Sequence, residues 1–315
     1  MSGKRSWLVL AGGLSHERDV SLRSGRRCAD ALRGAGHQVV LRDADATLLT
    51  ELANRPYDAA LIALHGGAGE DGALRQVLDL VGLPYVGSAP AACRAAWDKP
   101  TAKDALGRAG LRTPASVTLP HAAFRDLGAA AVLDRIVEHL GLPLMVKPAR
   151  GGSALGATVV DTSQDLPPAM VQCFSYGESA LVESFVEGTE LAVTVLDDAD
   201  GPRALPAVEI VPVSGVYDYA ARYTAGQTEF FTPARLATAV AAEVARVAVA
   251  AHVALGLRDL SRVDLIVDAA GVAQLLEVNV APGMTETSLL PMGVEAAGLE
   301  LGAVLGSLLE RAASR

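Results

Sequence analysis

The stretch "LLEVNVAPGMT", residues 275–285, places a carboxylate (Glu277) and an amide (Asn279) two positions apart in an apolar run. A second apolar run, "SRVDLIVD" at 261–268, precedes it across a short turn-like connection. Because side chains alternate along a strand, Glu277 and Asn279 share one face, and antiparallel pairing can bring Asp264 opposite them. Two carboxylates and an amide oxygen suit Mg²⁺, which completes its shell with water and phosphate oxygens. The same pattern is equally compatible with an alternative, in which the two carboxylates lie at strand ends and are simply exposed to solvent.

The composition bounds the class of protein. A chain of 315 residues is long enough for two or three packed units, and 50% hydrophobic with 4% aromatic residues suits an α/β protein. The net charge of −9 argues against a nucleic-acid surface, although a nucleotide pocket needs only a few local cations. The longest apolar stretch, 236–257, is interrupted by Glu243, Arg246 and His252 and reads as a packed helix. We expect a cytoplasmic protein without a membrane or nucleic-acid partner, since the N-terminal apolar run is shorter than a signal segment.

Three scattered cysteines imply no disulfide framework, and we expect them to be packing residues: Cys28, Cys93 and Cys173.

The first hundred residues alternate strand and helix signals, which is the pattern of a parallel sheet. Strands are predicted at 6–13, 37–43 and 58–67, with a helix at 21–36. From 99 to 141 the pattern is helical, and the later elements follow a different order. These are a hairpin around a glycine loop at 142–160, strand, short helical turn and strand over 180–198, a helix at about 234–255, two final strands, and a closing helix from about Leu299. We place domain limits at 1–97, 98–183 and 184–315.

Lysine side chains that could bind the phosphates of a nucleoside triphosphate lie near glycine-rich segments. Lys147 ends an apolar strand just before the glycine-rich loop 151–156, whose backbone N–H groups could approach phosphate oxygens. The order, lysine before glycines, excludes a P-loop. Glu183 and Glu190 flank an apolar turn, as a hinge gripping adenine and ribose would, but two surface glutamates would look the same. Lys99, in "WDKPTAK", is equally ordinary by itself.

Polar residues also follow the early strands, where α/β sheets bind ligands. His65 ends a strand in "LHGGAGEDG", and Glu17 follows the first strand. The alternative for the acids Glu70 and Asp71 is helix capping. The first turn lacks G-x-G-x-x-G, which disfavours a dinucleotide fold. The stretch "VYDYAARYTAGQTEF", 216–230, is too polar for a core strand and reads as a mobile covering loop or as a solvated one.

Nine stretches together, in this order, resemble the D-alanine–D-alanine ligases of the ATP-grasp superfamily. They are "GGLSHERDVSLRSG", "LHGGAGEDG", "LPYVGS", "WDKPTAK", "VKPARGGSALG", "VESFVEGTE", "YDYAARYTAG", "SRVDLIVD" and "EVNVAPGMTETSLLP". The resemblance implies an α/β (α+β) ATP-grasp fold of three subdomains, with a parallel-sheet N-terminal domain and ATP between the last two parts. It also implies a homodimer and a role in peptidoglycan synthesis.

The reaction implied is an ATP-dependent ligation. The carboxylate of a first D-alanine attacks the γ-phosphate to give an acylphosphate and ADP, and the amino group of a second D-alanine then displaces phosphate. The enzyme would act mostly by positioning and by neutralising charge.

The resemblance carries roles onto matching positions. Glu17 would hold the first ammonium group and link to Ser153 and Tyr223, closing the covering loop. His65 would lie near the second substrate and help its amine lose a proton. Arg262 and the Gly283 N–H would face the carboxyl oxygens, while Ser288 and Leu289 would position the second carboxylate. ATP would contact Lys99, Lys147, Glu183, Val186, Glu190 and Arg222, and two Mg²⁺ ions, or Mn²⁺ in their place, would bind Asp264, Glu277 and Asn279.

Several positions depart from the family pattern. Arg222 replaces the usual lysine, "RGGSALG" replaces "EGSSVG" and so introduces Ala154, and Arg75-Gln76 stands where Gln-Gly is usual. Val280 removes a hydroxyl beside the metal ligands, whereas Tyr223 favours amide over ester formation. Three alternatives remain: a ligase for other amino acids in a specialised pathway, a non-catalytic nucleotide-binding regulator, and a nicotinamide dehydrogenase, which lacks the fingerprint.

Overall fold

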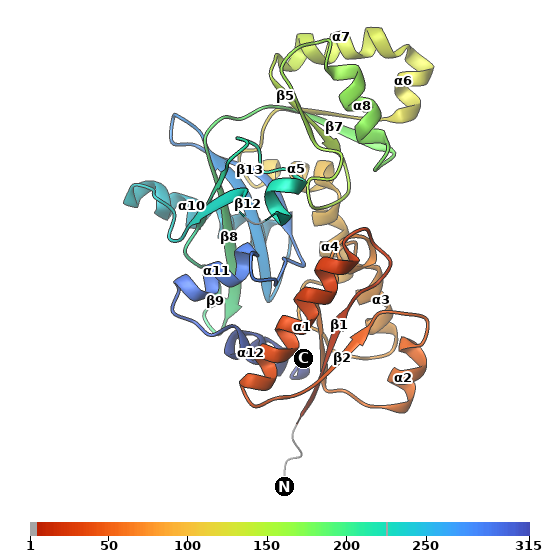
Figure 1. Cartoon of the computed structure of the whole chain (residues 1–315), viewed down its shortest axis with the longest axis vertical. Coiled ribbons are helices and arrows are strands. Elements are labelled where there is room, and N and C mark those ends of the chain that lie inside the picture. Colours follow the sequence, from red (N-terminus) through yellow and green to blue (C-terminus); the bar gives the residue numbers. More distant parts are fainter. Residues whose placement is uncertain (1–4, 225) are drawn as a thin grey trace.

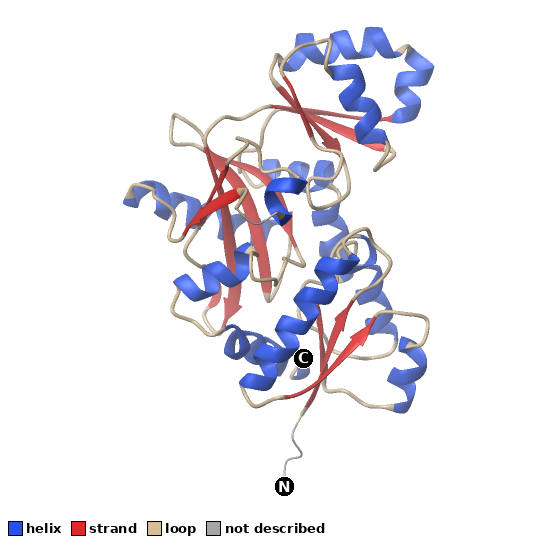
Figure 2. Ribbon diagram, in the orientation of Figure 1, coloured by secondary structure: helices blue, strands red, loops and turns tan. Residues whose placement is uncertain are grey.

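A computed structural model describes residues 5–224 and 226–315. Three sheets with their covering helices follow one another along the long axis of the molecule (Figures 1 and 2). The mixed α/β architecture with a parallel N-terminal sheet confirms the predicted fold class.

The first sheet is parallel, in the order β2-β1-β3. Its strands are β1 (Ser6–Ala11), β2 (Gln38–Asp43) and β3 (Ala59–Ile62), and β1 is central and almost wholly buried, as its apolar run predicts. The helices of this part are α1 (Arg18–Gly34), α2 (Leu48–Asn54), the single turn η1 (Gly67–Gly69), α3 (Ala73–Leu80) and α4 (Pro90–Trp97).

The second sheet is antiparallel, in the order β4-β7-β5-β6. Its strands are β4 (Ser116–Pro120), β5 (Leu144–Pro148), β6 (Thr158–Val160) and β7 (Ser179–Ser184), and β5 and β6 form the predicted hairpin around the glycine loop. Helices α6 (His121–Leu127), α7 (Ala129–Leu140) and α8 (Leu166–Phe174) pack on it through a separate apolar core. Helix α5 (Lys99–Arg108) instead contributes to the core under the third sheet.

The third sheet runs β11-β10-β8-β12-β13, with β9 paired to β8. The strands are β8 (Thr189–Asp198), β9 (Gly201–Ala204), β10 (Val208–Pro212), β11 (Thr228–Phe231), β12 (Leu260–Val267) and β13 (Ala273–Asn279). Helix α10 (Thr238–Ala254) buries its apolar side against this sheet, which confirms a packed helix in the longest apolar stretch. The remaining helices are α9 (Tyr219–Tyr223), α11 (Leu289–Ala296) and α12 (Leu301–Ala313).

Some element predictions are wrong. Strand β4 interrupts the region read as helical because Val117 and Leu119 pack into the core of the second sheet, and residues 185–188 form a loop without a helical turn. The sequence predictions also lack strands β9 to β11 and helices α8 and α11, and the region predicted as a covering loop contains α9 and the start of β11. These elements are short and their sequences are weakly periodic. The strands among them form because they pair with neighbouring strands of the sheet.

Helix α12 returns from the third sheet to pack beside α1 of the first (Figure 1). The contact is close: a Cβ on Gly302 would lie 2.2 Å from the carbonyl oxygen of Ala31. Only glycine permits this approach, and α12 thereby joins the first sheet to the adjacent third sheet in one apolar core.

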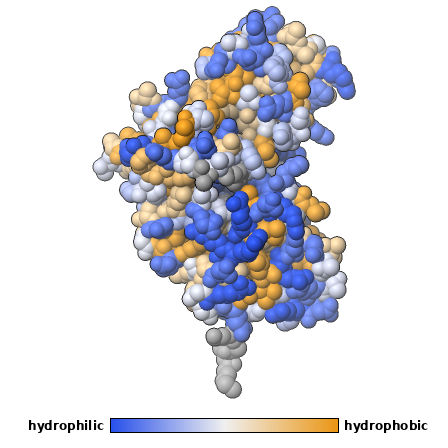
Figure 3. Space-filling view, viewed as in Figure 1, coloured by the Kyte–Doolittle hydropathy of each residue, from blue (hydrophilic) through white to orange (hydrophobic). Residues whose placement is uncertain are grey.

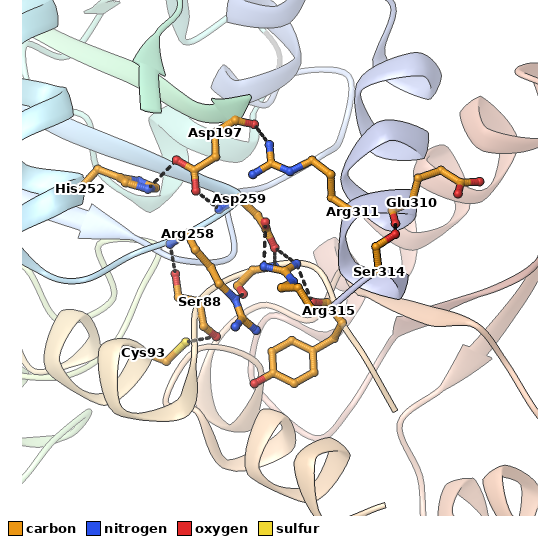
Figure 4. Close-up of polar contacts among 12 residues, drawn as sticks. Ser88, Cys93, Asp197, His252, Arg258, Asp259, Glu310, Arg311, Ser314 and Arg315 are labelled. Carbon is orange, nitrogen blue, oxygen red and sulfur yellow. Dashed lines mark hydrogen bonds and ion pairs between the residues drawn. The ribbon is translucent and has the colours of Figure 1, made fainter. Parts of the chain in front are cut away.

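A polar network reinforces the same junction (Figure 4). The buried carboxylate of Asp259 accepts from the Gly87 N–H at 2.7 Å and from the Arg315 guanidinium at 2.7 Å. The Asp259 N–H in turn donates to Asp197, whose carboxylate lies 3.3 Å from the His252 ring. The network therefore connects the loop between α3 and α4 with the end of β8 and the start of β12.

No single helix of the described chain is long and apolar enough to cross a membrane; α11 and α12 pass that test only as a pair, bent by 102°. On the face seen in Figure 3, hydrophobic residues form separate patches among hydrophilic ones. The three cysteines are free and buried, as expected.

Candidate active site

Two cavities adjoin where the three sheets meet. The larger, of about 420 Å³, lies between the second and third sheets, and the smaller, of about 60 Å³, lies toward the first. Four residues line both: Gly152, Tyr217, Arg222 and Glu277. The larger cavity has the size of a typical ligand pocket, whereas the smaller suits only a molecule of a few atoms.

The predicted site residues are divided between these two cavities. The larger is lined by Lys99, Lys147, Glu183, Val186, Glu190, Arg222, Asp264 and Glu277. The smaller is lined by Glu17, His65, Ser153, Arg222, Arg262, Glu277, Asn279, Gly283, Ser288 and Leu289. Tyr223 ends α9, and its side chain lies outside the described part of the structure.

Strands β12 and β13 form the predicted antiparallel pair. Asp264 lies opposite Glu277 and Arg262 opposite Asn279, with an irregularity after Asp264. Arg262 donates two hydrogen bonds of 2.7 Å to the Asp264 carboxylate, and both side chains are buried. This bidentate pair fixes the cation beside the acids and leaves other carboxylate lone pairs for a further ligand.

Electrostatics keep Glu277 ionised. Burial alone would raise the pKa of Glu277, but Lys99, Arg222 and Lys147 hold it at about 2. The Lys99 ammonium lies 3.6 Å from the Glu277 carboxylate and donates to the Gly151 carbonyl at 2.6 Å. Burial raises the pKa of Asp264, against the pull of Arg262.

The oxygen set fits Mg²⁺. Two carboxylates opposite one another and the Asn279 amide oxygen, which accepts from the Ala281 N–H at 3.3 Å, are hard ligands. Within the described residues, no group of three or more Asp, Glu, His and Cys side chains could hold a metal ion. The candidate metal centre therefore depends on the amide and on oxygens supplied by a bound phosphate.

Glu183 is held between two lysines. Its carboxylate pairs with Lys103 at 2.5 Å and with Lys147, and the side chain is 2% exposed. Burial alone would raise the pKa of Glu183, but Lys147 and Lys103 lower it. An anion thus faces the larger cavity from the middle of the second sheet.

Glu190, on β8, also lines the larger cavity. Burial, opposed by Arg222 and assisted by Asp264 and Glu277, raises its pKa to about 7. Near neutral pH this carboxyl group can either donate or accept a hydrogen bond, which suits a partner with hydroxyl groups.

The smaller cavity joins the first sheet to the glycine loop. Ser153 donates to the Glu17 carboxylate across more than a hundred residues of chain, and Ser153 adopts a left-handed backbone with φ 53°. Burial raises the pKa of Glu17. Glu70 accepts from the Gly66 N–H at 2.9 Å, and burial beside Glu17 raises its pKa to about 8.

His65 is fully engaged within the protein. Its Nδ1 lies 3.0 Å from the Ala281 carbonyl, which can only accept, so Nδ1 carries the proton and Nε2 accepts from Ser24 at 2.7 Å. Burial lowers the pKa of His65 to about 4, so the ring is neutral. This geometry favours a structural role for His65, in which it holds the Ala281 loop in place. It does not favour a role in which His65 takes a proton from a substrate.

The last wall of the smaller cavity precedes α11. The Ser288 hydroxyl accepts from the Thr285 N–H at 2.9 Å, and a Cβ on Gly283 would lie 2.7 Å from that hydroxyl. Leu289 starts α11, so unpaired backbone N–H groups face an anion placed here.

Sequence reasoning did not assign Lys103 or Glu70. Lys103 stands four positions after Lys99 on α5, and this spacing puts both lysines on one helix face. This spacing in the stretch "DKPTAK" is the sequence signal that indicates two cations on the same side of α5. Glu70 was read only as a cap, because nothing in its neighbours shows that two distant acids lie beside it.

Arg222 bridges both cavities from α9. Its guanidinium stacks over the Tyr217 ring at 4.3 Å and donates to the Tyr217 carbonyl at 3.2 Å. Because the guanidinium group is planar, this contact holds Arg222 against Tyr217, which lies just before α9. Arg75, another departure, is buried and donates to the carbonyl of Gly69 and, at 3.5 Å, to that of Val280.

Comparisons with known proteins agree with this geometry. The family model described as D-ala D-ala ligase C-terminus matches residues 106–310. A curated D-alanine–D-alanine ligase from Bordetella petrii is 43% identical over 98% of this chain and 92% of its own, and one from Anaeromyxobacter dehalogenans strain 2CP-1 is 41% identical over 99% and 98%.

Solved structures are similar over the whole chain. The VanG D-Ala:D-Ser ligase from Enterococcus faecalis has a TM-score of 0.84 at 26% identity, covering 98% of this chain and 99% of its own. The D-alanine–D-alanine ligase from Bacillus anthracis complexed with ATP has a TM-score of 0.81 at 26% identity, covering 98% and 97%. The chain belongs to the D-alanine–D-alanine ligase family, with the ATP-grasp fold.

Proposed function

We propose that this enzyme joins two molecules of D-alanine to D-alanyl-D-alanine for peptidoglycan synthesis, with conversion of ATP to ADP and phosphate. The observation that supports this most is the junction of the two cavities at Arg222 and Glu277. A triphosphate in the larger cavity and a small amino acid in the smaller one would bring a phosphate and a carboxylate together there.

In the first step, Glu17 holds the ammonium group of the first D-alanine, supported by Ser153, and Tyr223 closes the loop above. The carboxylate of this D-alanine attacks the γ-phosphate, while Lys99, Lys147 and Arg222 neutralise the charge on the phosphates. Glu183, Val186 and Glu190 hold the adenosine. The products are a D-alanyl phosphate and ADP.

In the second step, the amino group of the second D-alanine attacks the acyl carbon, and inorganic phosphate leaves. Arg262 and the Gly283 N–H stabilise the oxyanion of the tetrahedral intermediate. Ser288 and Leu289, at the start of α11, bind the carboxylate of the second D-alanine, and His65 holds the opposite loop.

Asp264, Glu277 and Asn279 would hold two Mg²⁺ ions, or Mn²⁺ in their place. A bound divalent ion would supply charge neutralisation between phosphate oxygens. We further propose that the enzyme is a cytoplasmic homodimer, and light scattering tests the dimer through its mass in solution. Within each subunit, we propose domains at residues 1–97, 98–183 and 184–315.

The defining experiment measures phosphate release from Mg-ATP with one amino acid at a time, with products identified by mass. D-Alanine alone is expected to give strong release and the dipeptide. D-Serine with D-alanine, D-lactate with D-alanine, and L-alanine are the comparisons. ATP binding without turnover on D-alanine contradicts the proposal.

A second candidate is a ligase that accepts a different amino acid. It is favoured by two departures from the family pattern on the lining of the larger cavity, Ala154 and Arg222. Mixed product with D-serine exceeding D-alanyl-D-alanine in the same assay would support this candidate over the first.

A further inference from the structure

We propose that Lys103 determines the preference of this enzyme for adenine, by keeping the Glu183 carboxylate anionic and aimed into the nucleotide cavity when Lys147 turns to the phosphates. The inference rests on the proposed function, because it takes the larger cavity as the ATP site. Lys103 would be a positioning residue that acts through Glu183.

The arrangement places two cations on one buried acid. Lys103 comes from α5 and Lys147 from β5, and they pair with different oxygens of Glu183. In the described chain, the two lysines are the charged groups that face Glu183. The residues opposite Glu183 on the neighbouring strands are uncharged: Ser116 on β4 and Met145 on β5. One lysine suffices to balance one carboxylate, so the second is in excess.

The two lysines differ in what else they can reach. Lys147 lines the larger cavity beside the glycine loop. Lys103 does not line this cavity, although both of its partners, Glu183 and Pro114, do. Lys103 lies behind Glu183, 9% exposed, and its ammonium also donates to the Pro114 carbonyl at 2.8 Å. Lys147 can therefore leave for a phosphate, whereas Lys103 is anchored.

The chemistry of the base then decides what Glu183 selects. An ionised carboxylate can only accept hydrogen bonds, so it matches the 6-amino group of adenine and repels the 6-oxo group of guanine or hypoxanthine. If Glu183 gained a proton, this distinction would vanish. A buried carboxylate without a cation tends to gain that proton, and Lys103 prevents it while Lys147 is engaged.

The test compares two nucleotides that differ only in that amino group. Affinities for ATP and for purine riboside 5′-triphosphate, which lacks it, are measured by calorimetry with Mg²⁺ present and D-alanine absent. The unmodified protein is expected to prefer ATP by at least about tenfold, since a hydrogen bond to a charged group contributes this much. Lys103→Gln is expected to lose that preference through weaker ATP binding, with the affinity for the purine analogue unchanged.

Matched variants separate positioning from general damage. Lys103→Arg keeps the charge and is expected to keep the preference. Arg235→Gln removes a cation from Glu209, which lies outside both cavities, and is expected to change neither affinity. If thermal melting shows that Lys103→Gln is unfolded, Lys103→Met, which keeps the length of the side chain, replaces it.

Equal loss of affinity for both nucleotides in Lys103→Gln, or an unchanged preference for ATP, would overturn the inference. Because D-alanine is absent, these affinities remain readable even for an enzyme that binds ATP and ligates another substrate. Failure of the proposed function would instead appear in the phosphate-release assay.

Discussion

At the scale of single residues, Glu277 is the acid on which both cavities converge. Glu277→Gln is expected to lower kcat by at least about 100-fold, because an amide cannot neutralise the cations that gather around the transferred phosphate. The fold should persist, since glutamine keeps the shape of the side chain. Steady-state phosphate release and thermal melting measure the two effects.

The matched control for this change is Glu229→Gln, an exposed glutamate on β11 of the same sheet. It should leave both activity and melting temperature unchanged. Near-normal turnover of Glu277→Gln would refute the metal assignment.

At the scale of elements, the start of α3 depends on a glycine. Gly72 has φ +88°, and a Cβ there would lie 2.5 Å from the Pro90 carbonyl oxygen. The obstacle is backbone, which cannot move aside cheaply. Gly72→Ala is expected to reduce the free energy of unfolding by about 2–4 kcal/mol, from left-handed strain and overlap together.

Gly82→Ala separates the two contributions. Gly82 has a similar φ, +70°, but its Cβ would meet nothing within 4 Å, so a loss of about 1 kcal/mol is expected. Urea denaturation of both variants gives the comparison. Equal losses would mean that the contact with Pro90 relaxes freely.

At the scale of the whole molecule, the network around Asp197 makes stability depend on pH (Figure 4). Burial lowers the pKa of His252, although Asp197 opposes this. As pH falls through about 6.5, the ring gains a proton in the unfolded chain before it does so in the folded protein. The free energy of unfolding therefore decreases toward acid, by up to about 1.4 kcal/mol per pH unit from this group.

Urea denaturation between pH 5 and 8 measures this effect, with His252→Asn as the comparison. The variant has no proton to gain and can still hydrogen-bond Ser261 or Asp197. Its stability is expected to vary less over this range, while other acids contribute equally to both proteins. Parallel curves would show that the pKa of His252 is the same in the folded and the unfolded protein.

The sequence by itself determined the succession of strands and helices along the first domain and its parallel sheet. It also determined the β5–β6 and β12–β13 hairpins and the pairing of Asp264 with Glu277. Their periodicity and turns are local, and alternation of side chains carries the chemistry to one face. It also determined the family, since nine motifs in order are read without coordinates.

Only the tertiary structure decided which distant groups meet. The Glu17–Ser153 bond, the enclosure of Glu183 by Lys103 and Lys147, and the raised pKa of Glu70 each join separate parts of the chain. The edge strands β4, β9 and β11 likewise exist because a neighbour satisfies their backbone groups. Burial and charge act through space, so these features depend on the assembled fold and not on the spacing of residues along the chain.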